Sequence, residues 1–353
     1  MKSPLMLKRR NQHFIWLGAV VVVGVLPLIF GDGYSQTVIL TIGLYAIFGI
    51  GLQITMGTGG ILNMGHAAFI GIGAYSSAIV TSKGGNPWVG MLVGILAAGL
   101  LALIVGLPIL RLRSLYLAIA TLCVALAVTN VLGFWTALTG GQNGITGIQP
   151  FAIGDFSFID LPSQIYLIWG FLLVAVLIRI NLRYSVVGRE FEAIKDSDLA
   201  TSALGINHGA RRLQVFVIGS VIGAVGGSLY ATYLSAITPD LFGFPFLIQI
   251  FVLVALGGMV SLWGSPIGAI AVVCLHEFII PAISGGNAGP VEIIIFGVIL
   301  VIVMIFAPNG LTDQIVTTTR RLVKLARRQR NRNEPQRVDE SVPPVKSTKK
   351  ATA

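Results

Sequence analysis

The chain has 353 residues, of which 55% are hydrophobic and only 11% are charged, and its formal net charge is +10. A soluble domain carries about 25% charged residues, so this composition, with a mean hydropathy of +0.86, excludes an ordinary soluble fold. Residues 14–307 form a nearly unbroken series of apolar stretches, and the few charges fall almost entirely between them. The sequence therefore predicts an all-α polytopic membrane protein.

The apolar stretches predict about ten transmembrane helices, because one crossing needs about 20 apolar residues. We read the first as a retained helix rather than a signal peptide, since no small-residue cleavage site follows it. The spans are expected near residues 14–30, 38–56, 66–82, 88–110, 114–136, 163–180, 212–236, 246–262, 266–281 and 290–307.

Basic residues mark alternate connections between these spans. They occur in the N-terminal tail 1–13, at Arg111 and Arg113, in the segment 181–211 and in the tail 308–353. Because basic loops stay in the cytoplasm, an even number of spans with both termini cytoplasmic is expected. We interpret 14–307 as one transmembrane domain with a cytoplasmic loop at 181–211. The basic C-terminal tail is expected to be disordered and to contact anionic lipid head groups, not nucleic acid.

The second predicted connection is rich in glycine. Gly57, Gly59, Gly60 and Gly65 precede the short run 66–82, which is therefore a candidate for a broken or re-entrant helix. Non-helical backbone at membrane depth persists only where protein or a water-filled cavity satisfies it. The candidates for the translocation path are thus Gly59, Gly60, Gly65 and His66.

Two interpretations of His66 are open. The imidazole could line or gate the path, or it could bond backbone carbonyls freed by the helix break, and the second role is favoured. Farther along, Gly219, Gly223 and Gly227 recur every fourth residue. This spacing predicts a helix face that packs closely against another helix.

The longest polar stretch between spans, residues 188–207, is predicted to form an amphipathic helix that ends at Gly205. Its apolar stripe consists of Phe191, Ile194, Leu199 and Leu204. From spacing alone, a solvated connector and a docking helix are equally supported, although a connector could be much shorter.

Three stretches resemble a known family. Residues 43–78 carry a glycine run that leads into Gly-His-Ala-Ala-Phe at 65–69, residues 188–230 hold the polar stretch and the next span, and residues 253–269 read LVALGGMVSLWGSPIGA. They resemble the permease subunits of bacterial ATP-binding cassette (ABC) importers for branched-chain amino acids, in the subtype that pairs with a second, related permease. The chain departs from the family at Thr201 and Ser202, where an acidic or alanine-rich pair is commoner.

The resemblance implies a multi-pass subunit of the bacterial inner membrane. With the second permease it would form the pore, receive an amino acid from a periplasmic or extracellular binding protein, and be driven by two ATPase subunits. The 188–207 helix would couple to those ATPases through polar contacts from Glu192, Lys195 and Asp196. Its apolar face would pack against the ATPase or against the permease's own helix ends through Phe191, Ile194 and Leu199, and Gly205 would allow the turn that ends it.

The residues independently support separate ATPase chains. No GxxxxGK[ST] phosphate-binding loop is present, so the chain is expected to be a transport subunit and not an enzyme, and no cofactor or metal site is predicted.

Alternatives remain in other classes. A self-sufficient secondary transporter or channel needs ion ligands or charged rings at membrane depth. From 38 to 178, however, every charged residue maps to a connection. A membrane enzyme would need a nucleophile, a base and an orienting carboxylate at one span end, and the sequence does not bring such groups together. Within the importer family, urea and short amides are alternative substrates.

Overall fold

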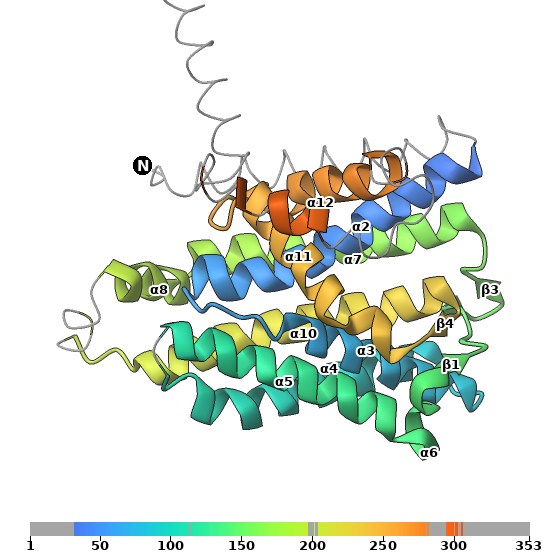
Figure 1. The fold of residues 1–353 in the computed structure, drawn as a ribbon, viewed down its shortest axis with the longest axis horizontal. Coiled ribbons are helices and arrows are strands. Elements are labelled where there is room, and N and C mark those ends of the chain that lie inside the picture. Colours follow the sequence, from blue (N-terminus) through green and yellow to red (C-terminus); the bar gives the residue numbers. More distant parts are fainter. Residues whose placement is uncertain are drawn as a thin grey trace, which may run out of the picture. The chain divides into compact units, whose positions relative to one another are not determined.

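The computed structural model describes residues 32–112, 114–196, 201, 204–279, 281, 294–299, 301, 302 and 305. This part of the chain is almost wholly helical (Figure 1). The longer helices are α2 (Gly33–Gln53), α3 (His66–Ser82), α4 (Pro87–Ile109), α5 (Ser114–Phe134), α7 (Leu161–Tyr184), α8 (Val186–Asp196), α10 (His208–Leu234), α11 (Phe244–Gly257) and α12 (Gly264–Cys274). The short elements are the π-helices η1 (Ile54–Thr58) and η4 (Leu275–Ile279), the 3₁₀ turns η2 (Gly141–Asn143) and η3 (Pro239–Phe242), helix α6 (Thr136–Thr139), and strands β1 (Ile145–Thr146), β2 (Ala152–Ile153), β3 (Phe156–Ser157) and β4 (Ala236–Ile237).

Six helical segments of the described chain are long and apolar enough to cross a membrane. They are Gly33–Thr58, Pro87–Ile109, Leu115–Phe134, Leu161–Tyr184, His208–Leu234 and Pro239–Gly257. Every span predicted between residues 38 and 281 corresponds to a helix, so the polytopic helical architecture is confirmed. The predicted span 14–30 and the two tails lie outside the described residues, so the count of ten and the side of each terminus stay predictions.

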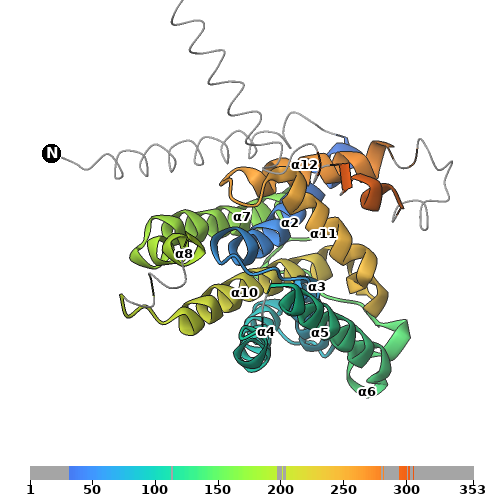
Figure 2. The same ribbon diagram turned by 60° about the vertical axis from the view of Figure 1, so that its left-hand side comes forward.

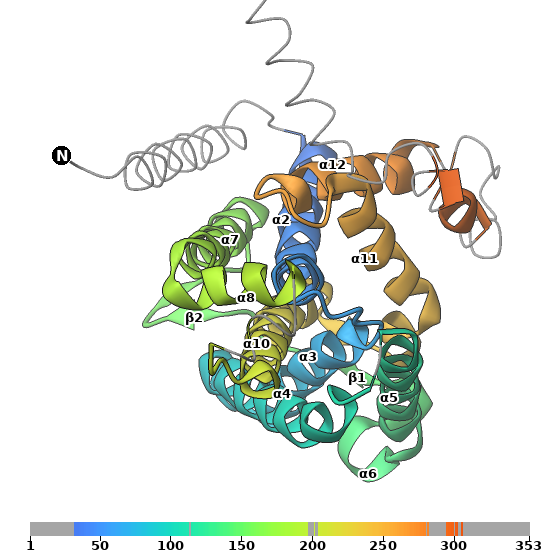
Figure 3. The same cartoon turned by 90° about the vertical axis from the view of Figure 1, so that its left-hand side faces the viewer.

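Helix α2 lies at the centre of the described helices. It contacts α7, α10, α11 and α12, as the end-on view in Figure 3 shows. Much of its second half is fully buried, including Leu44, Phe48 and Ile50. A helix that is apolar on all sides fits this central place, because each of its faces meets another helix rather than water.

Helices α3, α4 and α10 pack against one another (Figure 2), and glycines let α10 approach both α3 and α2 closely. A Cβ at Gly227 would lie 2.0 Å from the Ile70 carbonyl oxygen, and one at Gly219 would lie 2.6 Å from the Gly51 carbonyl oxygen. Backbones approach so closely only where the side chain is absent. The close-packing face predicted from the glycine spacing of α10 is therefore confirmed.

The outer surfaces of α4 and α5 are exposed and apolar. Leu96, Leu100 and Ile104 of α4 are each at least 60% exposed, as are Leu115 and Phe134 of α5. A soluble monomer rarely exposes so large an apolar surface. In a bilayer the same surface meets lipid tails or another membrane subunit at no cost.

Short strands close the end of the helices that lies opposite α8 (Figure 1). Strand β1 pairs antiparallel with β4, which places Ile145 opposite Ile237, and β2 pairs with β3 in a hairpin. The Trp88 indole Nε1–H donates a 2.8 Å hydrogen bond to the Ala152 carbonyl and so joins the hairpin to the start of α4.

Candidate translocation path and coupling site

The helix at 66–82 is unbroken, and the irregular backbone precedes it. Helix α3 begins at His66, beside Phe48 and Gly51 of α2. The α2–η1 helix continues from Phe48 to Thr58, ten residues or roughly 15 Å at the α-helical rise. Helix α3 therefore starts well inside the bundle, and the chain from Gly59 to Gly65 turns back from the helix end to reach it. Of the two alternatives predicted for 66–82, the broken helix is wrong, because α3 is continuous and the irregular backbone precedes His66. The re-entrant helix stays a prediction.

Protein groups satisfy much of this irregular segment. The Ile61 N–H donates to the Thr55 carbonyl at 3.0 Å, and the Met64 N–H donates to the Thr121 hydroxyl of α5 at 3.0 Å. Gly60 has a φ of +64°, a conformation that glycine adopts without strain. A Cβ at Gly65 would lie 2.7 Å from the Thr121 carbonyl oxygen. Two glycines of the segment are thus required for different reasons, one for its turn and one for close approach to α5.

His66 is enclosed between two helices. Its side chain is 2% exposed, and its Nε2–H donates to the Phe48 carbonyl at 3.1 Å. A Cβ at Gly51 would come within 2.8 Å of the imidazole, and one at Gly223 within 2.9 Å. The imidazole therefore fills the space that these two glycines leave open. Of the four path candidates, only Gly60 is exposed, whereas Gly59, Gly65 and His66 are buried or nearly so.

Helix α8 lies across the ends of its neighbours, as Figure 3 shows, and follows α7 after one residue, Ser185. Its Phe191 is 1% exposed and Ile194 is buried, and α8 contacts α7, α10 and η1. The apolar face is thus packed on the permease body itself. An ion pair of 2.6 Å between Glu190 and Arg211 adds a link to α10.

The junction of α7 and α8 is tight. A Cβ at Gly188 would lie 2.1 Å from the Leu182 carbonyl oxygen, and the Ser185 hydroxyl accepts a hydrogen bond from the Gly188 N–H at 3.0 Å. The same hydroxyl donates to the Leu182 carbonyl at 2.7 Å. The backbones of α8 and of the end of α7 are therefore in contact at this junction.

The rest of the predicted coupling segment is only partly described. Glu192, Lys195 and Asp196 belong to α8, but their side chains lie outside the described structure, and Leu199 lies outside the described residues altogether. Leu204 was predicted as part of the apolar stripe of this helix, but it lies in a turn outside α8 and is 77% exposed. Gly205 has a φ of +74°, which suits the turn predicted there.

Thr201, where the chain departs from the family pattern, has a specific partner. Its hydroxyl and His208 Nε2, at the start of α10, are 2.7 Å apart. The Asn207 side chain caps α10 by accepting from the Ala210 N–H at 3.1 Å. The return from the polar segment to α10 is therefore held by side-chain hydrogen bonds.

One buried cation was not predicted from the sequence. Arg179 of α7 is 4% exposed, and its guanidinium donates to the Gln53 side chain and, at 2.8 Å, to the Ser261 carbonyl. It falls just inside the predicted span 163–180, one residue before the end of that span. An ionisable residue within an apolar run marks a candidate functional position, and that signal could have found it.

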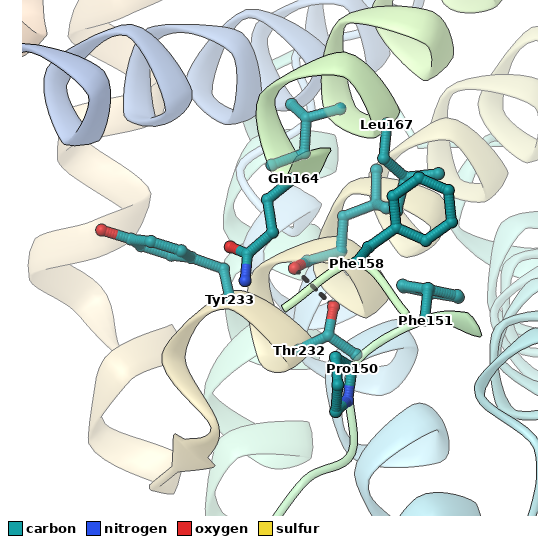
Figure 4. A pocket seen from close by; sticks show the side chains of 9 residues that line it. Pro150, Phe151, Phe158, Gln164, Leu167, Thr232 and Tyr233 are labelled. Carbon is teal, nitrogen blue, oxygen red and sulfur yellow. Dashed lines mark hydrogen bonds between the residues drawn. The ribbon is translucent and has the colours of Figure 1, made fainter. Parts of the chain in front are cut away.

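A small pocket lies near the strand end of α7 (Figure 4). It is lined by Pro150, Phe151, Phe158, Gln164, Leu167, Ile168, Leu229, Thr232 and Tyr233. Its free space of about 10 Å³ is no more than a single water needs. The pocket cannot hold an amino acid. The described residues also contain no cluster of three or more His, Cys, Asp or Glu side chains that could hold a metal ion.

These features define a class: a multi-pass helical membrane protein. Inside its bundle an irregular segment joins η1 to α3, and the amphipathic helix α8 lies across the helix ends. A family model described as the branched-chain amino acid transport system permease component matches residues 35–308. The chain belongs to this family.

Relatives within the family are similar over most of their length. The chain is 30% identical to the high-affinity branched-chain amino acid transport system permease protein LivM of Escherichia coli, over 84% of this chain and 74% of LivM. It is 26% identical to a probable LivM of Methanocaldococcus jannaschii, over 78% of this chain and 92% of that one. It is 28% identical to the E. coli permease protein LivH, over 64% of this chain and 78% of LivH.

Proposed function

We propose that this chain is the transmembrane permease subunit of an ABC importer that carries leucine, isoleucine and valine across the inner membrane. The observation that carries the proposal is the family match over 35–308, together with relatives named as branched-chain amino acid permeases. The largely apolar body, with few groups that could bind a charged side chain, is compatible with aliphatic substrates.

The proposed assembly contains a second, related permease, two ATPase subunits and a substrate-binding protein on the outer side. Similarity to both LivM and LivH supports the pairing of two related permeases. The chain itself would span the membrane ten times with both termini in the cytoplasm. Its tail 308–353 would rest on anionic lipid.

In the proposed mechanism, α8 is the element that the ATPases move. Phe191 and Ile194 hold it on the permease body, so the opposite, polar face is available to a partner. Glu192, Lys195 and Asp196 would make the polar contacts and Leu199 an apolar one, while exposed Leu204 would enter a groove of the ATPase. Since α8 and the end of α7 touch at Gly188, closure of the ATPase dimer would tilt α7 and the helices packed on it.

The segment 59–65 is proposed as the wall of the translocation path. Gly60 would face the path directly, because it is the exposed member of the segment. Gly59, Gly65 and His66 would hold the segment in position through their close contacts with α10, α5 and α2. Interrupted helices near the membrane midplane form substrate sites in several transporter folds, which supports this placement.

Co-purification and reconstitution test the proposal. Tagged chain extracted in mild detergent should bring down ATPase chains and a second permease. The assembly in liposomes should take up radiolabelled leucine only when ATP is present on the side of the membrane that carries the ATPases and the binding protein is present on the other side. Uptake by the chain alone would instead support a secondary carrier. Urea or acetamide uptake without leucine uptake would favour the amide-transporting branch, and a thermal-shift screen of the binding protein against both ligand classes would decide the substrate.

A further inference from the structure

Arg179 is a buried cation without a described counter-ion. Its guanidinium is 4% exposed, and no carboxylate in the described part of the chain lies within ion-pair distance of it. Burying a charge is costly unless hydrogen bonds or an opposite charge compensate for it. The contacts that replace the counter-ion therefore indicate what Arg179 does.

Carbonyl oxygens and one amide side chain provide the compensation. Arg179 donates to the Ser261 carbonyl at 2.8 Å, to the Leu262 carbonyl at 3.3 Å and to Gln53 Oε1. Ser261 and Leu262 belong to the connection 258–263 between α11 and α12, whereas Gln53 is the last residue of α2. One planar guanidinium thus joins three separate parts of the fold, which its fan of five N–H donors allows.

Gln53 extends the same network. Its Nε2 donates to the Gly258 carbonyl at 2.5 Å and to the Ser261 carbonyl at 2.8 Å, and its Oε1 also accepts from the Ser265 hydroxyl of α12 at 2.6 Å. Gln53 and Ser265 are fully buried. A fully satisfied buried network defines one arrangement of the elements that it joins.

The network lies between α8 and the segments 54–65 and 258–263. Arg179 is on the last turns of α7, whose end touches α8 at Gly188. On the other side, a Cβ at Gly57 of η1 would lie 1.9 Å from the Met259 carbonyl oxygen. The connection 258–263 is therefore in backbone contact with the start of the segment 54–65.

We propose that Arg179 is the positioning residue that transmits movement of α8 to two segments: 54–65, which consists of η1 and the irregular backbone before α3, and 258–263, which connects α11 and α12. This rests on the proposed function, in which α8 is moved by ATPases. When the end of α7 moves, the guanidinium carries the carbonyls of 258–263 and the Gln53 amide with it, and the Gly57 contact passes the displacement to the path segment. A lysine keeps the charge but, as a compact ammonium on a flexible stem, cannot hold three partners in one plane.

The test uses the complete importer in liposomes and measures uptake and ATP hydrolysis together. For Arg179→Lys we expect ATP hydrolysis to continue while leucine uptake per ATP falls about tenfold, the factor that loss of one hydrogen bond to a charged group produces in an equilibrium. The matched control is Arg111→Lys at the end of α4, where the arginine is exposed and the ratio should stay at the wild-type value.

A proportional fall of both activities in Arg179→Lys, or a wild-type ratio, would overturn the proposal. If that variant fails to assemble, Ser265→Ala decides, because it removes one hydroxyl from the network and leaves the charge in place. We expect uptake per ATP to fall about threefold in Ser265→Ala, and an unchanged ratio would refute the coupling role. Failure of the wild-type complex to take up leucine would instead refute the proposed function. The same ratio of uptake to ATP hydrolysis, measured for Ser265→Ala with the solute that the complex does take up, would then decide the role of the network.

Discussion

Replacing Gly227 with alanine should separate α3 from α10. The added Cβ would lie 2.0 Å from the Ile70 carbonyl oxygen, about 1.4 Å short of the 3.4 Å at which ordinary contact begins. Backbone on both sides of the contact cannot rotate away as a side chain would, so the two helices must move apart. Overpacking of this kind costs about 1–3 kcal/mol, and the closely packed α3–α10 face would lose contacts along its length.

Gly170 of α7 provides the matched control, because nothing lies within 4 Å of a Cβ built there. The same change at Gly170 should be neutral or stabilising by up to about 1 kcal/mol, since alanine loses less backbone entropy than glycine in a helix. Thermal unfolding of the detergent-solubilised protein can be followed by size-exclusion chromatography after heating. The unfolding midpoint of Gly227→Ala should be clearly lower than that of the wild type, and the midpoint of Gly170→Ala should equal or exceed it. Equal midpoints for the two variants would refute the packing argument.

Three further outcomes are expected. Phe191→Ala should destabilise the protein by about 3–5 kcal/mol, as for a buried aromatic, whereas Leu204→Ala, which alters an exposed side chain, should change the thermal midpoint little; similar losses would contradict the packing of α8. Gly205→Val should reduce uptake by the assembled complex before it reduces yield, because valine disfavours the positive φ there, and wild-type uptake would count against this. Thr121→Val should cost about 1–3 kcal/mol by leaving the Met64 N–H without its acceptor, and an unchanged midpoint in thermal unfolding would exclude that role.

Sequence reasoning located the helices well because the length of an apolar run is a local property. The runs predicted at 66–82 and 88–110 correspond to α3 and α4 within one residue at each end. Asn86 and Pro87 mark the start of α4 in the usual way, with the Asn86 side chain accepting from the Trp88 N–H. The four-residue glycine spacing in α10 also predicted a closely packed helix face, since small residues at that spacing lie on one side of a helix.

The depth at which α3 begins could not be predicted. A glycine-rich connection signals irregular backbone, but only the contacts of His66 with α2 and α10 reveal that the helix starts inside the bundle. Such contacts join residues far apart in the chain, and neither run length nor periodicity encodes them.

The buried network around Arg179 was missed for a related reason. Gln53 lies inside the predicted span 38–56 and Ser265 in the predicted connection before 266–281, and each alone is compatible with a helix end or a packing face. They form one hydrogen-bonded network only because the fold brings α2, α7 and the 258–263 connection together at the Arg179 guanidinium. In membrane spans, isolated polar residues should therefore be considered together as possible partners before they are assigned to connections.

In the proposed importer, α8 faces the cytoplasm, where ATPases can move it. Because native Cys123 is exposed, it and Cys274 are first replaced by serine. Single cysteines are then introduced at Leu204, beside the coupling helix, and at Ile159, which is 66% exposed near the strands at the opposite end. A membrane-impermeant maleimide should label the Leu204→Cys protein only in inside-out vesicles and the Ile159→Cys protein only in right-side-out vesicles. Labelling of Leu204→Cys in sealed right-side-out vesicles would contradict the account.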